Sequence, residues 1–128
     1  LTLEHKENYR EIFSDLLQAR GGAVLFHCTS GKDRTGMVSA LMLAALGASD
    51  DDIIGDYVLT NGRIEPISFL DEGVDADVIR HIMAAESDYM LTALDTMRAE
   101  YGSIDNYLTQ ALQLGELDRV KLSETLVA

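Results

Sequence analysis

Apolar residues recur at helical spacing along most of the chain. Between Leu3 and Arg20 they fall on one helical face, and two glycines follow as a stop signal. A second stretch, from Thr35 to Leu46, is apolar almost all round, which is typical of a buried central helix. Further helices are expected to begin at Ser49 with a capping box at Asp52, at Asp75, at Ser87, at Ser103 and at Glu116.

One short stretch has a different pattern. Ala23 to Phe26 is a continuous apolar run, which predicts a central parallel strand buried on both faces. Because a single strand cannot satisfy its own backbone groups, its neighbours must come from outside this chain. We therefore expect an α/β fold in which helices flank a central parallel sheet. This chain would supply one strand and most of the helices.

Composition narrows the function classes. The 128 residues suffice for one modest domain, and a single Cys excludes an internal disulfide. The three His residues show no metal-ligand spacing with that Cys, so we expect neither a metal nor another cofactor. The net charge of -12 argues against nucleic acid or an anionic membrane as a standing partner. No apolar run is long enough to predict a transmembrane segment.

The stretch from His27 to Gly36, HCTSGKDRTG, predicts an anion-binding loop between the expected strand and the central helix. Its backbone N–H groups and the N-terminus of the helix can surround a tetrahedral dianion. These donors, with Lys32 and Arg34, should lower the pKa of Cys28 and make its thiolate a nucleophile. The planar guanidinium of Arg34 can hold two phosphoryl oxygens.

The other loop residues have expected supporting roles. Thr35 can hydrogen-bond the sulfur when it becomes a leaving group, and His27 would orient the loop from beneath. Gly31 and Gly36 would allow a positive φ or a close approach of the backbone to the ligand. The residues expected to bind substrate are Thr29, Ser30, Gly31, Lys32, Thr35 and Gly36.

The loop resembles the His-Cys-x5-Arg-Ser/Thr signature of cysteine-dependent protein tyrosine phosphatases. It is most similar to the HCxxGKDRTG form of a bacterial family with dual or triple specificity, whose members also accept phosphoinositides. Residues 55–61, GDYVLTN, resemble that family's ADYLLSN segment. Residues 101–108, YGSIDNYL, resemble its YGSIDGYL segment. The resemblance covers the chain from about Gly22 onward.

The resemblance implies a protein tyrosine phosphatase-like fold. Residues 1–128 would be the C-terminal portion of a single phosphatase domain, completed by an N-terminal segment or a second chain. Because the chain begins with Leu1 rather than Met, we expect a fragment or a processed product. Residues 61–73, which include Pro66, are the best linker candidate, and residues 66–86 would form a helical lid or, alternatively, two packed helices.

The expected activity is hydrolysis of phosphomonoesters through a phosphocysteine intermediate, with Cys28 as nucleophile and Arg34 on the phosphoryl oxygens. The resemblance suggests Asp33 as general acid; otherwise it stabilises the loop. Substrates would be phosphotyrosine in proteins, phosphoserine or phosphothreonine, or phosphoinositides, which Lys32 could recognise. The alternatives are an inositol phosphate phosphatase, a rhodanese-type sulfurtransferase and a non-catalytic phosphate-binding module. We expect a cytoplasmic protein, with secretion left open by the start of the chain.

Overall fold

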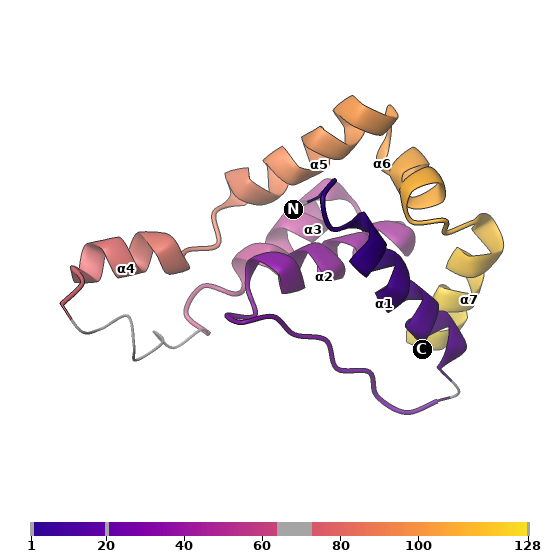
Figure 1. The fold of residues 1–128 in the computed structure, drawn as a ribbon, viewed down its shortest axis with the longest axis horizontal. Helices are drawn as coiled ribbons and strands as arrows, with labels where there is room; N and C mark the ends of the chain where they lie inside the picture. The colour runs from indigo at the N-terminus through magenta and orange to yellow at the C-terminus, as the bar shows by residue number, and fades with distance from the viewer. Residues whose placement is uncertain (1, 20, 64–72, 128) are drawn as a thin grey trace.

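The computed structural model describes residues 2–19, 21–63 and 73–127 of the chain. Helices account for the regular structure in these ranges (Figure 1). They are α1 (Lys6–Gln18), α2 (Asp33–Ala45), α3 (Asp50–Val58), α4 (Ala76–Met83), α5 (Ser87–Tyr101), α6 (Ile104–Asn106), the π-helix η2 (Tyr107–Ala111) and α7 (Glu116–Leu126).

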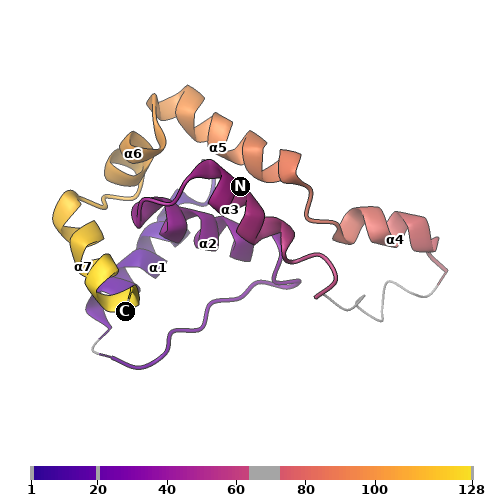
Figure 2. The same cartoon turned by 180° about the vertical axis from the view of Figure 1, so that it is seen from behind.

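The helices pack around α2. This helix contacts α3, α3 contacts α5, and α1 lies against α7 at the other side of the bundle (Figure 1). Figure 2 shows the same arrangement from behind, with α4 displaced from the bundle along its longest dimension. The fully buried large side chains that form the centre of the core are Phe13, Leu41, Leu94, Met97, Tyr107, Leu108 and Leu114.

The central position of α2 follows from its composition. Its apolar side chains point in several directions rather than to one face, so the helix needs neighbours on most sides. Met37, Val38, Ala40 and Leu41 are all buried. This confirms the prediction of a buried central helix, although α2 begins at Asp33, two residues earlier than expected.

Predicted caps define several helix starts. The hydroxyl of Ser49 accepts a hydrogen bond from the Asp52 amide at 3.2 Å, and the Asp52 carboxylate accepts one from the Ser49 amide at 3.2 Å. Asp75 accepts a bond from the Asp77 amide at 2.8 Å in the same way at the start of α4. These contacts satisfy N–H groups that have no partner within the helix.

The predicted sheet is wrong. Residues 23–26 form no strand, and the described ranges contain no strand or sheet at all. Val24 is 47% exposed and Leu25 is 87% exposed, while Phe26 packs partly against the core. An apolar run becomes a strand only when other strands satisfy its backbone, and the described part of the chain offers none. The segment instead runs as an extended connection along the outside of the bundle (Figures 1 and 2).

Two predicted segments are described only in part. Residues 64–72, including Pro66, lie outside the described residues, and with them most of the 61–73 linker and the first part of the 66–86 segment. The rest of that segment contains α4. None of the described helices is both long and apolar enough to cross a membrane.

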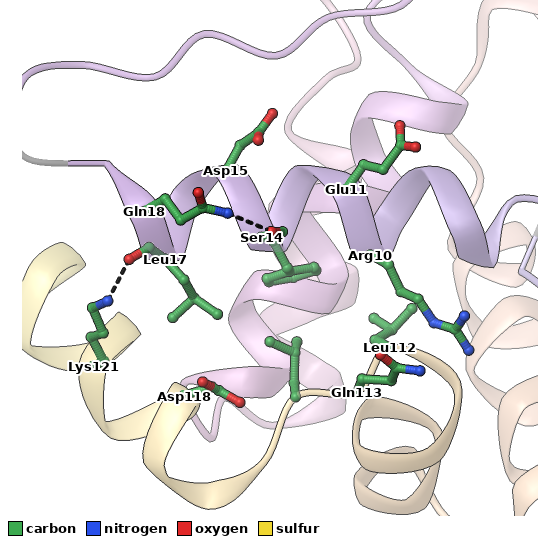
Figure 3. A pocket seen from close by; sticks show the side chains of 12 residues that line it. Arg10, Glu11, Ser14, Asp15, Leu17, Gln18, Leu112, Gln113, Asp118 and Lys121 are labelled. Carbon is green, nitrogen blue, oxygen red and sulfur yellow. Dashed lines mark hydrogen bonds between the residues drawn. The ribbon is translucent and has the colours of Figure 1, made fainter.

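A cavity of about 580 Å³ is lined by residues of α1, of α7 and of the connection that precedes α7 (Figure 3). The ammonium group of Lys121 lies at its edge and donates a hydrogen bond to the backbone carbonyl of Leu17 at 2.5 Å. Gln113 in its wall has a positive φ of 59°. Lys121 thus joins α7 to the C-terminal end of α1.

Candidate active site

The loop of residues 27–32 leads directly into the first turn of α2. Lys32 occupies the N-cap position, and its carbonyl accepts a hydrogen bond from the Gly36 amide at 2.7 Å. The loop therefore lies at the positive end of the helix dipole. Gly31 has a φ of 63°, in the left-handed region that favours glycine, as the sequence predicted.

Cys28 is surrounded by hydrogen-bond donors. The Thr35 hydroxyl donates to the Cys28 sulfur at 3.2 Å. Burial raises the pKa of the thiol, but hydrogen bonds from that hydroxyl and from the amides of Thr35, Ser30 and Gly31 outweigh it and lower the pKa to about 6. Each donor stabilises the thiolate relative to the thiol. Cys28 is therefore mostly thiolate at neutral pH.

Arg34 bends back over the loop. Its guanidinium donates to the Thr29 hydroxyl at 3.2 Å. Arg34, Cys28 and Thr35 together line a cavity of about 270 Å³ whose other wall comes from α1. The Cys28 thiolate and the Arg34 guanidinium therefore line the same cavity, in which a small anion can contact both groups.

Tyr9 of α1 lines the same cavity, and the sequence did not single it out because its spacing fits an ordinary core position. It is 3% exposed, and its buried hydroxyl has no hydrogen-bond partner among the described residues. Burial raises the pKa of Tyr9, and the charge of Arg34 partly opposes this. A buried hydroxyl without a partner is costly unless a ligand or water satisfies it.

Asp33 is tied to a neighbouring helix. Its carboxylate accepts a hydrogen bond from the Tyr57 hydroxyl of α3 at 3.1 Å and lies 3.6 Å from the Lys32 ammonium. Burial, followed by the charge and hydrogen bond of Asp33, raises the pKa of Tyr57, which therefore stays a donor. Nothing in the local sequence around the loop indicates Tyr57, because the contact joins residues 24 positions apart.

Gly36 has a packing role that the sequence did not indicate. A Cβ atom at this position would lie 2.8 Å from the Tyr57 ring, closer than real side chains approach. The glycine therefore lets α2 and α3 come together where Tyr57 reaches Asp33.

The Lys32 side chain is buried against backbone carbonyls, whereas the His27 side chain, expected to orient the loop from beneath, is exposed. Lys32 is 6% exposed, and its ammonium donates to the Ile82 carbonyl at 2.6 Å and to the Ala84 carbonyl at 3.2 Å. The His27 ring lies 3.3 Å from the Cys28 carbonyl. The described residues contain no group of three or more His, Cys, Asp or Glu side chains placed to hold a metal ion.

Residues 1–128 match the model of a tyrosine phosphatase family. The chain is 38% identical over 114 residues to a Cupriavidus necator protein provisionally named a tyrosine-protein phosphatase, covering 83% of this chain and 42% of that protein. It is 30% identical over 112 residues to the triple specificity protein phosphatase PtpB of Mycobacterium tuberculosis, covering 74% of this chain and 41% of PtpB. The chain thus spans about two fifths of the length of these relatives. No solved structure matches it.

Proposed function

The chain belongs to the tyrosine phosphatase family, and on that premise we propose that it carries the nucleophile and phosphate-binding loop of a cysteine-dependent phosphomonoester hydrolase. The Cys28 sulfur attacks phosphorus, the bond to the ester oxygen breaks, and a phosphocysteine forms. Water then cleaves the sulfur–phosphorus bond and releases inorganic phosphate.

The placement of Cys28 beside the Thr35 hydroxyl, in a cavity that Arg34 also lines, is the observation that carries this proposal. A pKa of about 6 makes the sulfur a nucleophile at neutral pH without a neighbouring base. The Thr35 hydroxyl, 3.2 Å from the sulfur, also stabilises it when it leaves as a thiolate in the second step.

Arg34 supplies the charge for the phosphoryl oxygens. Its present partner, the Thr29 hydroxyl, is neutral and exposed, so exchanging that bond for a charge-assisted pair with a phosphate is favourable. The amides of residues 29–34, at the N-terminus of α2, would hold the remaining oxygen, whereas the Gly36 amide already donates to the Lys32 carbonyl. The same donors would both bind the phosphoryl oxygens of the substrate and stabilise the charge on those oxygens in the transition state.

Asp33 is our candidate for the acid that protonates the leaving oxygen. Its side chain is half exposed and adjoins Arg34 in the sequence, which supports access to a bound substrate. The hydrogen bond from Tyr57, however, ties the Asp33 side chain to α3 and so supports a role in holding the loop in shape. A general acid and a loop-shaping residue predict a different dependence of the rate on the leaving group.

Phosphotyrosine in proteins is the proposed substrate class. The name of PtpB states triple specificity for that protein, which supports extending the proposal to phosphoserine, phosphothreonine and phosphoinositides. The expectation that Lys32 recognises additional phosphate groups needs its buried ammonium to leave two carbonyl partners. A simple aryl phosphate carries no additional phosphate group, so its recognition does not require Lys32 to leave these carbonyls.

We also propose that further polypeptide covers residues 23–26 in the working protein. Val24 and Leu25 are exposed apolar side chains that directly precede the signature loop, and leaving them in water is unfavourable. The relatives are more than twice as long as the matched segment, so they contain enough additional chain to do this.

The decisive experiment compares the full-length protein with its Cys28→Ser variant. Phosphate release from an aryl phosphate and a phosphotyrosine peptide should fall by about 10³-fold or more, because the serine hydroxyl stays protonated. Phosphate binding, measured by calorimetry, should survive because the amides and Arg34 remain. Turnover by the serine variant would contradict the covalent route. Binding without turnover in the unmodified protein would favour the non-catalytic phosphate-binding module.

A further inference from the structure

The Lys32 ammonium connects the signature loop to a helix fifty positions away. Ile82 and Ala84, its two carbonyl partners, lie at the C-terminal end of α4. The last carbonyls of a helix have no partner within it, and a cation there also complements the helix dipole. Lys32 therefore acts as a distant C-cap for α4 while occupying the N-cap position of α2.

The junction between α4 and α5 is held at a second point by Asn61, which follows α3. The Asn61 side chain donates to the Ala85 carbonyl at 2.9 Å and accepts from the Ala85 amide at 2.8 Å. Ala85 is buried. Residues 82–85 are thus fixed from two sides by polar side chains, one of which belongs to the signature loop.

The rest of α4 contributes little to the common core. Val78 and Ile82 are largely exposed, and its buried residue Ile79 lies outside the main core cluster. The helix stands away from the bundle and joins it through its C-terminal end (Figures 1 and 2). Among the described residues, the side-chain hydrogen bonds at residues 82–85 join this end of α4 to the loop and to the residues after α3.

We propose that Lys32 is a positioning residue that couples the geometry of the signature loop to the docking of the C-terminal end of α4. It does so from within the loop, between Cys28 and Arg34, through its bonds to the Ile82 and Ala84 carbonyls. Asp33, 3.6 Å from the same ammonium, joins the network and links it to Tyr57. The inference rests on the proposed function only in naming phosphate as the anion of the loop.

Coupling of this kind is reciprocal. If an anion in the loop favours the arrangement in which Lys32 reaches α4, then docking of α4 favours anion binding by the same factor. Phosphate should consequently protect α4 even though the helix itself need not touch it. A lysine that only recognises phosphate groups on the substrate would give no such protection.

The test is amide hydrogen exchange of residues 76–85 in the full-length protein without substrate. In Lys32→Met, which keeps the length of the side chain but removes the donors, these amides should exchange about tenfold faster than in the unmodified protein. Lys121→Met is the matched control, because Lys121 also donates to a helix-end carbonyl, that of Leu17, but lies at the other side of the bundle (Figure 3). It should leave residues 76–85 unchanged.

Saturating inorganic phosphate provides a second measurement that needs no variant. In the unmodified protein it should slow exchange both in the loop, residues 28–36, and in residues 76–85. Protection of the loop without protection of residues 76–85 would overturn the coupling. Absence of protection at the loop as well would instead contradict the proposed phosphate site, so the two failures are distinguishable.

Kinetics separate positioning from substrate recognition. Lys32→Met should lower kcat/KM by the same factor for a simple aryl phosphate and for an inositol polyphosphate, because α4 docking is common to both reactions. A loss confined to the KM of the inositol polyphosphate, with unchanged exchange in α4, would assign Lys32 to substrate recognition and refute the inference.

Discussion

The hydroxyl of Thr35 should set much of the reactivity of Cys28. It donates to the sulfur at 3.2 Å and is the first among the hydrogen bonds that lower the pKa of the thiol to about 6. A hydrogen bond to a charged group contributes about 1.5–3 kcal/mol, and about 1.4 kcal/mol corresponds to one pKa unit. Because Cys28 is partly exposed, we take the lower end of that range. Thr35→Val, which keeps the branched shape, should raise the pKa to about 7.

The assay is the rate at which iodoacetamide alkylates Cys28 as a function of pH, followed by mass spectrometry of the Cys28 peptide from the full-length protein. Only the thiolate reacts, so the midpoint of the profile reports its pKa. At pH 6 the variant should react several times more slowly. Thr96→Val, which removes a hydroxyl bonded to the Thr92 carbonyl on α5, is the control and should leave the midpoint unchanged. A midpoint near 6 in Thr35→Val would refute the reasoning.

Two further substitutions test the surroundings of the loop. Asp33→Asn should slow hydrolysis of an alkyl phosphate by about 10²–10⁴-fold but that of an activated aryl phosphate much less if Asp33 is the acid; an equal loss for both, measured as kcat, would mean that Asp33 only shapes the loop. Gly36→Ala should destabilise the protein by about 1–3 kcal/mol in denaturant unfolding, since its Cβ would meet the Tyr57 ring at 2.8 Å. Gly55→Ala, with open space at the same kind of helical position, should be neutral or stabilising, and equal effects of the two substitutions would contradict the packing argument.

Local signals in the sequence predict the helices well. Ser49, Asp75 and Ser103 each cap the helix that they were expected to begin, because a capping hydrogen bond spans only two or three residues. The apolar run of α2 predicts its burial for a similar reason. The π-helix η2 and the positive φ of Gln113 have no such short-range signal in the sequence.

The predicted strand shows where local pattern reasoning fails. Residues 23–26 have the composition of a buried strand, yet the described structure leaves Leu25 in water and forms no sheet. Apolar composition indicates that a segment benefits from burial, but the formation of a strand depends on partners at other positions. Sequence periodicity cannot supply those partners.

The residues of the candidate site also fall into two groups: some are close in the sequence, and others are brought together only by the fold. Cys28, Thr35 and Arg34 lie close in sequence, and their fixed offsets were enough to predict a loop with a thiolate and a guanidinium at one cavity. Tyr57 and the α4 partners of Lys32 are 24 and 50 or more positions away, so only the fold brings them to the loop. The environment of the loop was therefore less predictable than its chemistry.

The first turn of α2 is part of the proposed phosphate-binding loop, and its next two turns lie in the middle of the hydrophobic core. No hinge separates these two parts, because Met37 and Val38 are buried directly after Gly36. We therefore expect the loop to have no independent melting transition, so that heat or denaturant that loosens the core also disorders the phosphate-binding loop. Conversely, an anion bound at the first turn should stabilise the whole bundle by mass action, so the free energy of unfolding should rise with the occupancy of the site.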